Sequence, residues 1–253
     1  MKQQKLSFQN SYGQKIVGIL YSPEKVGKIC MVYCHGYRSS KNSDRIKPLA
    51  ERLAKEDISL FAFDFSGRGE SEGKFEFTTI TKYVDDLSNA IKAMSKKFSD
   101  ICIAGASLGG YVALNSAIKE KNVKLVVLFS PVSQFPWKDR DEFSAEKLKE
   151  WKKNGFTYTH SARYGDMKIN YAFYEDGIKC AKYEDYEKIK VPVLIVHGTA
   201  DASVPVDHSR ELIKHLKKSR LEELKGADHT YTRSTDAREA EELTANFVVR
   251  MLK

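Results

Sequence analysis

The sequence predicts an α/β protein with a mostly parallel central sheet, helices on its faces and one inserted segment. Three observations predict this fold class. Short apolar runs alternate with longer amphipathic stretches over the first 130 residues. Several apolar runs contain almost no polar residue, which is typical of strands that are covered on both faces. The alternation stops after Pro131 and resumes near Val191, so we expect one domain whose core is interrupted by an insertion.

The expected strands are the short runs rich in apolar and β-branched residues, such as ICMVYC and LVVLFS. In chain order they are Ile16–Tyr21, Ile29–Cys34, Leu60–Phe65, Ile101–Gly105, Leu125–Ser130, Val191–Val196 and Leu221–Leu224.

The expected helices are the amphipathic stretches between these strands. In chain order they are Ser43–Lys55, Ile80–Phe98, Leu108–Lys119, Val206–Lys217 and Asp236–Leu252. Residues 1–130 and 187–253 therefore form the expected core, and residues 131–186, which hold both tryptophans and many other aromatic residues, form an expected cap.

The composition is that of a globular protein of enzyme size rather than a nucleic-acid-binding protein. The chain has 253 residues, and 42% of them are hydrophobic, which is enough for a buried core. The formal net charge of +8 could indicate contact with phosphates. However, the basic residues alternate with 34 acidic ones, as in Lys119-Glu120-Lys121. This pattern is typical of a solvated surface, so we expect no nucleic-acid partner.

The start of the chain, MKQQKLSFQN, lacks the apolar core of a signal peptide, and no run of about 18 apolar residues follows. We therefore expect a cytoplasmic protein without a membrane span, as a monomer or homodimer. The four cysteines form no CxxC pair and no Cys/His metal spacing, so no metal or other cofactor is expected. Cys34 adjoins an HG segment and could line a site, but a buried, reduced thiol is the favoured interpretation.

A serine in the middle of the chain has the surroundings of a catalytic nucleophile. Ser107 lies between Gly105 and Gly109 in a G-x-S-x-G pattern. Such a serine is held on a sharp turn between a strand and a helix, where side chains at the flanking positions would collide. The apolar stretch Ile101–Ala104 precedes the pattern and the amphipathic stretch Tyr111–Ile118 follows it. The context that this pattern requires is therefore present.

The same pattern occurs a second time around Ser71, in GESEG. This copy lies in a hydrophilic stretch and continues into Lys74-Phe75-Glu76, with no helix to complete the turn. Because a short pattern gains its meaning from its context, we interpret Ser71 as a loop serine and Ser107 as the nucleophile.

One histidine is placed to act as the general base. His229 lies in a loop after the last expected strand and before the last helix. In a parallel sheet such a loop opens at the same edge as the Ser107 turn. The other histidines end a strand, lie on a charged helix, adjoin the HG segment or fall in the insertion, where packing or solvated roles are commoner. They are His35, His160, His197, His208 and His215.

The acid that orients this histidine must come from the same edge of the sheet. Asp201 follows the apolar strand Val193–Val196 and precedes a turn at Val204-Pro205. Asp228 adjoins the histidine but would have to fold back on its neighbour, and Asp207 lies on the following helix. We therefore favour Asp201, with the other two aspartates as alternatives.

Taken together, the segments GASLGG, HGTADASVP and GADHTY, with HGY at residues 35–37 and DFSGRGESEG at 64–73, resemble the α/β-hydrolase superfamily. The Ser, Asp, His chain order is also that of this superfamily. Within it, the sequence most resembles bacterial carboxylesterases of the cinnamoyl or feruloyl esterase and monoacylglycerol-lipase-like groups. The resemblance implies an α/β-hydrolase fold with a small inserted cap.

The resemblance also implies an oxyanion hole, where backbone N–H groups stabilise the charge on the reacting carbonyl oxygen. The residue after the nucleophile, Leu108, supplies one donor, and the position after His35-Gly36 assigns the second to Tyr37. An ordinary HG turn is the alternative for the second. In the cap, Trp137, Trp151 and Tyr171 are candidates to contact the substrate, although cap aromatics could equally form a small core of their own.

These residues predict a serine esterase that uses Ser107, His229 and Asp201 to cleave a small carboxylic ester of an aromatic or short-to-medium acyl group through an acyl-enzyme. A thioesterase or an acyl-aminopeptidase-like amidase on the same residues is the first alternative. A non-catalytic binding protein on a hydrolase scaffold is the second.

Overall fold

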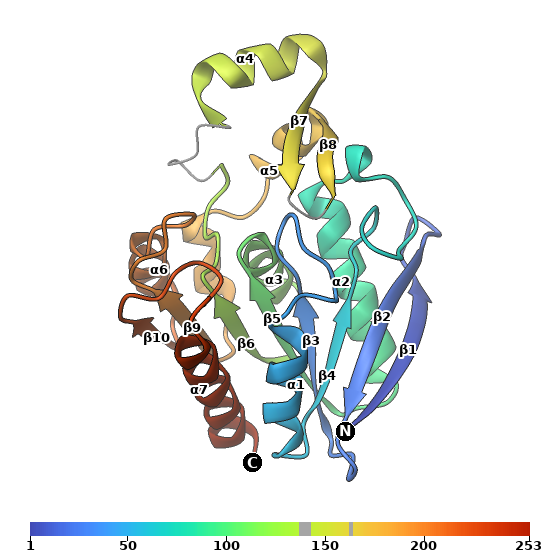
Figure 1. Cartoon of the computed structure of the whole chain (residues 1–253), viewed down its shortest axis with the longest axis vertical. Coiled ribbons are helices and arrows are strands. Elements are labelled where there is room, and N and C mark those ends of the chain that lie inside the picture. Colours follow the sequence, from blue (N-terminus) through green and yellow to red (C-terminus); the bar gives the residue numbers. More distant parts are fainter. Residues whose placement is uncertain (137–142, 162–163) are drawn as a thin grey trace.

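A computed structural model of the chain, which describes residues 1–136, 143–161 and 164–253, has one large sheet with helices on both faces (Figure 1). The sheet has eight strands in the order β1-β2-β4-β3-β5-β6-β9-β10. Only the pairs β1·β2 and β2·β4 are antiparallel. The strands are β1 (Lys2–Gln9), β2 (Lys15–Ser22), β3 (Ile29–Cys34), β4 (Ser59–Phe63), β5 (Asp100–Ala106), β6 (Val123–Phe129), β9 (Val193–Gly198) and β10 (Ser219–Leu224). The predicted mostly parallel sheet is confirmed.

Two hydrophobic cores lie on the two faces of this sheet. In β3, Cys30, Val32 and Cys34 pack in one core, and the alternate residues pack in the other. Both faces are covered, so a polar residue has no place in this strand, which explains its unbroken apolar run. One face is covered by α2 (Ile80–Ser95), α3 (Leu108–Ala117) and α6 (Asp207–Leu212), and the other by α1 (Ile46–Ala54) and α7 (Ser234–Leu252).

The elements outside the insertion lie close to their expected positions, with two differences. The expected helix Val206–Lys217 divides into α6 and the 3₁₀ turn η4 (Ile213–His215). The strand β1 was not expected, because its residues are mostly exposed and polar. It is an edge strand that pairs only with β2, and such a strand needs no continuous apolar run.

The described part of residues 145–177 lies above the carboxyl ends of the parallel strands (Figure 1), whereas residues 183–188 return to the hydrophobic core through the buried Tyr186. The hairpin of this insertion is an antiparallel pair that does not join the main sheet. The elements between β6 and β9 are α4 (Ala145–Asn154), β7 (Phe156–Ser161), β8 (Gly165–Asn170), α5 (Ala172–Gly177) and the 3₁₀ helix η3 (Tyr183–Lys188). Another 3₁₀ turn, η1 (Phe75–Phe77), lies beside β8.

The cysteines are all free thiols. Cys30, Cys34 and Cys102 are fully buried in the cores, as expected, and burial raises the pKa of each thiol. Cys34 is thus a core residue. Within the described part of the chain, no helix has the length and apolar character that crossing a membrane requires.

Candidate active site

Ser107 lies on a sharp turn between β5 and α3. Its backbone has φ +52° and ψ −121°, a conformation that L-residues adopt only where the surroundings impose it. The two flanking glycines are required because backbone packs directly on backbone here. A Cβ on Gly105 would lie 2.2 Å from the Gly109 carbonyl oxygen, and a Cβ on Gly109 would lie 2.4 Å from that of Cys34. The predicted strand, serine and helix therefore form a strained turn with the serine at its apex.

Ser71, in the second copy of the pattern, has a structural environment. Its hydroxyl donates to the Asp64 carbonyl at 2.7 Å and accepts from the Val17 N–H at 2.9 Å. The side chain is buried between the loop after β4 and the strand β2. This hydroxyl joins two backbone segments, in agreement with the interpretation of Ser71 as a loop serine.

Asp201 and His229, which are 28 residues apart in the chain, lie in hydrogen-bond contact. The Nδ1 atom of His229 lies 2.6 Å from Oδ2 of Asp201. The Asp201 Oδ1 atom accepts backbone N–H groups from Ser203 and Val204, both at 2.8 Å. Because Nδ1 donates to the carboxylate, Nε2 is the nitrogen of His229 that is left to act on another group.

His197, expected to be a packing histidine at the end of a strand, also contacts this carboxylate. Its Nε2 lies 3.2 Å from Asp201 Oδ2 and 2.8 Å from the Val204 carbonyl, while its Nδ1 lies 2.7 Å from the Ser209 hydroxyl. A neutral ring with the proton on Nε2 satisfies all three contacts. The sequence signal that could have indicated this role is the HG pair at the end of an apolar strand, separated from Asp201 by only two residues.

The Asp201 carboxylate remains ionised in this environment. Burial by itself raises the pKa of Asp201, but hydrogen bonds from His197 and His229 and the backbone N–H groups outweigh burial and hold the pKa well below its usual value. A permanent negative charge therefore lies next to the His229 ring.

The alternative aspartates make other contacts. Asp228 accepts the N–H groups of Thr230 and Thr232, both at 3.0 Å, and so shapes the loop that carries His229. Asp207 pairs with Arg210 at 2.9 Å. Asp201 is the aspartate that meets His229.

The other histidines are also held by contacts of their own. His35 Nδ1 donates to the Gly36 carbonyl at 2.8 Å and its Nε2 accepts the Phe65 N–H at 3.2 Å. Burial lowers the pKa of His35 to about 4, so this ring is neutral and structural. His160 pairs with Asp166 in the hairpin, and His215 in η4 pairs with Glu211 in α6.

Ser107 and His229 line one cavity of about 670 Å³, a volume within the range of small-molecule sites. The predicted residue Tyr37 also lines this cavity. Two further lining residues, Arg38 and Arg45, were not expected from the sequence. The loop after β3 passes close to the serine, because a Cβ on Gly36 would lie 3.5 Å from the Ser107 Cβ. Leu108 is the first residue of α3, so its N–H has no acceptor within the helix.

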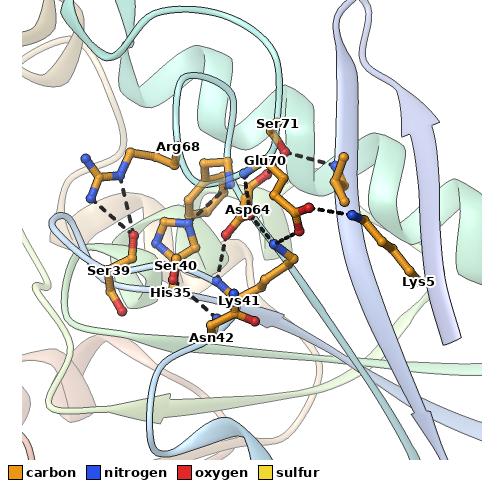
Figure 2. A network of polar contacts seen from close by, with 12 residues as sticks. Lys5, His35, Ser39, Ser40, Lys41, Asn42, Asp64, Arg68, Glu70 and Ser71 are labelled. Atoms are coloured by element: carbon orange, nitrogen blue, oxygen red, sulfur yellow. Dashed lines mark hydrogen bonds and ion pairs between the residues drawn. The ribbon is translucent and has the colours of Figure 1, made fainter. Parts of the chain in front are cut away.

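A buried ion-pair network holds the loop that carries Tyr37 (Figure 2). The Lys41 ammonium contacts Asp64 and Glu70, each at 2.6 Å, and Asp64 also accepts the Lys41 and Glu70 N–H groups at 2.8 and 2.9 Å. The side chains of Lys41 and Asp64 are 1% and 0% exposed. Because neither charge reaches water, each is stabilised by the opposite charge of the other. Glu70 in turn contacts Lys5 on β1.

Arg68 adds a second connection between the same loop and the inserted segment. Its guanidinium donates to the Ser39 carbonyl (Figure 2) and to Met167 Sδ in β8, and it lies 4.3 Å from the Tyr164 ring centroid. The DFSGRGESEG segment of the sequence thus joins the loop after β3 to the sheet and to the insertion.

The candidate substrate contacts in the insertion differ in their surroundings. Trp151 is buried, donates to the Ile169 carbonyl at 3.2 Å, and lines a second cavity of about 220 Å³. Tyr37 lines this cavity as well as the one at Ser107. Tyr171 packs against the rings of Trp151 and Tyr174 and lines neither cavity. Trp137 lies outside the described residues.

Comparison with known proteins assigns the family. The family model described as "Serine aminopeptidase, S33" matches residues 27–161, which is more than half of the chain. The chain belongs to this family. A second family model, that of the dienelactone hydrolase family, matches residues 154–253 of this S33 family member. Both are hydrolase families, and the protein is a hydrolase.

Individual relatives of this S33 family member are distant. "Palmitoyl-protein thioesterase ABHD10, mitochondrial" from Bos taurus is 24% identical over 217 residues, which cover 81% of this chain and 68% of that protein. Among solved structures, Est1E from Butyrivibrio proteoclasticus with bound ferulic acid has a TM-score of 0.82 and 23% identity, covering 98% and 99% of the two chains. The α/β hydrolase GrgF from Penicillium sp. sh18 has a TM-score of 0.85 and 16% identity, covering 100% and 99%. These structural likenesses establish the α/β-hydrolase fold.

Proposed function

We propose that this protein hydrolyses small carboxylic esters through an acyl-enzyme on Ser107, with His229 as general base and Asp201 as the group that orients it. The observation that carries the proposal is the 2.6 Å contact between Asp201 and His229, made at the cavity that also contains the strained Ser107 turn. A nucleophile, a base and an oriented acid are the groups that acyl transfer requires.

In the proposed reaction, Nε2 of His229 accepts the proton of Ser107 as its oxygen attacks the ester carbonyl. The N–H groups of Tyr37 and Leu108 stabilise the oxyanion, and a donor of this kind contributes about 10²–10³ in rate. His229 then protonates the leaving alcohol, and water releases the acyl group by the same sequence in reverse. Asp201 stabilises the imidazolium that forms in each half of the reaction. No metal or other cofactor takes part in this scheme.

We further propose that residues 131–186 act as a cap that selects the acyl group. Two observations support this role: the described part of residues 145–177 lies above the carboxyl edge of the sheet (Figure 1), and Tyr37 lines both the Ser107 cavity and the cavity beside Trp151. The second cavity suits an aromatic or short-to-medium acyl group, with Trp151 as its wall. Tyr171 would act indirectly by supporting Trp151.

A thioester is the second candidate substrate, because the ABHD10 relatives that match 81% of the chain are named palmitoyl-protein thioesterases. The same nucleophile and base serve both reactions, and only the leaving group differs. Matched hexanoate esters of 4-nitrophenol and hexanoyl thioesters separate the two. We expect the higher kcat/KM for the oxygen ester.

The first prediction concerns the nucleophile. A fluorophosphonate probe should label the wild-type protein and fail to label Ser107→Ala, and Ser107→Ala should lose ester hydrolysis by at least about 10³-fold, since a triad member is removed. Ser71→Ala is the matched control in the other copy of the pattern and should still be labelled. Labelling of Ser107→Ala, or loss of labelling in Ser71→Ala with its fold intact, would contradict the assignment.

A further inference from the structure

Arg45 lines the Ser107 cavity and forms no ion pair with any of the residues that the structure describes. It lines this cavity together with His229 and directly precedes α1. Among the described residues, no carboxylate oxygen lies within ion-pair distance of its nitrogens. Its Nη1 atom is buried and has no hydrogen-bond partner. Of the buried side-chain atoms that lack a partner in the described ranges, this one alone belongs to a permanently charged group.

Two aromatic rings hold the guanidinium in place. Its Cζ lies 4.2 Å from the ring centroid of Tyr231 and 5.1 Å from that of Phe129. Both rings are buried, and the Tyr231 hydroxyl donates to the Val196 carbonyl at 2.7 Å. Ring faces attract a cation but do not accept its N–H groups in directed hydrogen bonds. The Tyr231 hydroxyl also interacts with the guanidinium, but the buried Nη1 atom still has no acceptor among the described residues.

The neighbouring charges leave this cation without a close counter-ion. Apart from tyrosines, the other ionisable side chains that line the cavity are Arg38, Asp44 and His229. Arg38 donates to the His160 carbonyl at 2.6 Å. Asp44 is exposed, and Glu241 shares an adjoining cavity with Arg45, but neither carboxylate forms an ion pair with Arg45 among the described residues. Buried donors in native proteins are normally satisfied, and a guanidinium fork matches a carboxylate in two parallel hydrogen bonds.

We propose that Arg45 makes the enzyme selective for esters that carry a free carboxylate away from the scissile bond. This inference rests on the proposed ester hydrolysis at Ser107. The carboxylate of the substrate would take the place of the missing counter-ion while the ester carbonyl lies at Ser107 in the same cavity. A neutral substrate of equal length leaves the Arg45 donors unsatisfied and is bound less well.

The test compares two 4-nitrophenyl esters of similar size, the monoester of glutarate and the hexanoate. We expect Arg45→Gln to lower the ratio of kcat/KM for glutarate over hexanoate by about 10–100-fold, the range typical of a lost charge-assisted hydrogen bond. Arg45→Lys, which keeps the charge but not the planar fork, should recover part of that ratio. Arg38→Gln removes the same charge from the same cavity and should change the ratio by less than about threefold.

A binding measurement separates this inference from the proposed hydrolysis. Ser107→Ala cannot form an acyl-enzyme, but with Arg45 intact it should be stabilised against heat by free glutarate and not by hexanamide. The double variant with Arg45→Gln should lose that stabilisation. If the wild type cleaves neither ester while Ser107→Ala still binds glutarate, the proposed hydrolysis fails and the Arg45 site stands. An unchanged ratio in Arg45→Gln, an equal change in Arg38→Gln, or no glutarate binding would overturn the inference.

Discussion

The carboxylate of Asp201 receives two contacts on each oxygen, from the Ser203 and Val204 N–H groups on one side and from the rings of His197 and His229 on the other. This arrangement uses its full accepting capacity. It also fixes which way the carboxylate faces, and therefore which nitrogen of His229 carries the proton.

The second prediction follows from this arrangement. Asp201→Asn places an amide beside His229 and allows the wrong tautomer, so kcat for an ester should fall by about 10⁴-fold while the near-UV circular dichroism stays native. Asp228→Asn is the matched control, because Asp228 adjoins His229 in the chain but bonds to Thr230 and Thr232. Its activity should fall by less than about tenfold. A comparable loss in Asp228→Asn would mean that the acid has been assigned to the wrong residue.

At the scale of elements, the ion pair between Lys41 and Asp64 connects the loop after β3 to the loop after β4 (Figure 2). Burial lowers the pKa of Lys41, but hydrogen bonds to Asp64 and Glu70 outweigh it and raise the pKa above its usual value. The lysine therefore remains charged. Because the same loop carries Tyr37, the ion pair positions a proposed oxyanion donor without contacting the substrate.

The third prediction compares a buried and an exposed lysine. Lys41→Met leaves the Asp64 charge buried and unpaired and should lower the free energy of unfolding by about 3–5 kcal/mol. Lys28→Met breaks a pair with Asp100 in which the lysine is 64% exposed, and it should cost less than about 1 kcal/mol. Urea unfolding of both variants gives the comparison. Equal costs would show that the buried network does not stabilise the two loops.

At the scale of the whole molecule, Asp86 connects its own helix, α2, to two segments that are distant in the chain. Its two oxygens accept from the Asn10 side chain and the Ser66 N–H, both at 2.7 Å. Burial raises the pKa of Asp86 to about 6, although these hydrogen bonds oppose the shift. The folded protein thus holds this proton more tightly than the unfolded chain does, so the contribution of Asp86 to stability is greatest below about pH 4 and declines as pH rises through 6.

The fourth prediction concerns how the free energy of unfolding depends on pH. As pH rises, ionisation of Asp86 should lower this free energy, whereas ionisation of Asp201 should raise it. Ionisation of Asp86 should reduce the free energy of unfolding by at most about 3 kcal/mol between pH 4 and 7. Asp201, whose pKa is lowered, contributes stability that is present above about pH 4 and is lost below it. Urea unfolding of the wild type and Asp86→Asn at pH 4.5, 5.5 and 7 tests the first part. Parallel profiles for the two proteins would contradict it.

Short-range patterns in the sequence predicted the parts of this protein that short-range physics controls. The apolar run of β3 indicated a strand covered on both faces, and the glycines around Ser107 indicated a turn that tolerates no side chain. The edge strand β1 and the hairpin of the insertion escaped prediction. Most of their residues are exposed or only partly buried, and only pairing with a neighbouring strand makes them strands.

The sequence by itself thus determined the α/β class, the order of the core elements and the serine turn, because each depends on residues that are close in the chain. Only the tertiary structure decided which partners meet. It brought Asp201 to His229 across 28 residues, added His197 to the same carboxylate, joined Lys41 to Asp64, and left the Nη1 atom of Arg45 without a hydrogen-bond partner among the described residues. Such pairings depend on the distances between loops at one edge of the sheet, and these distances are set by the packing of the whole chain.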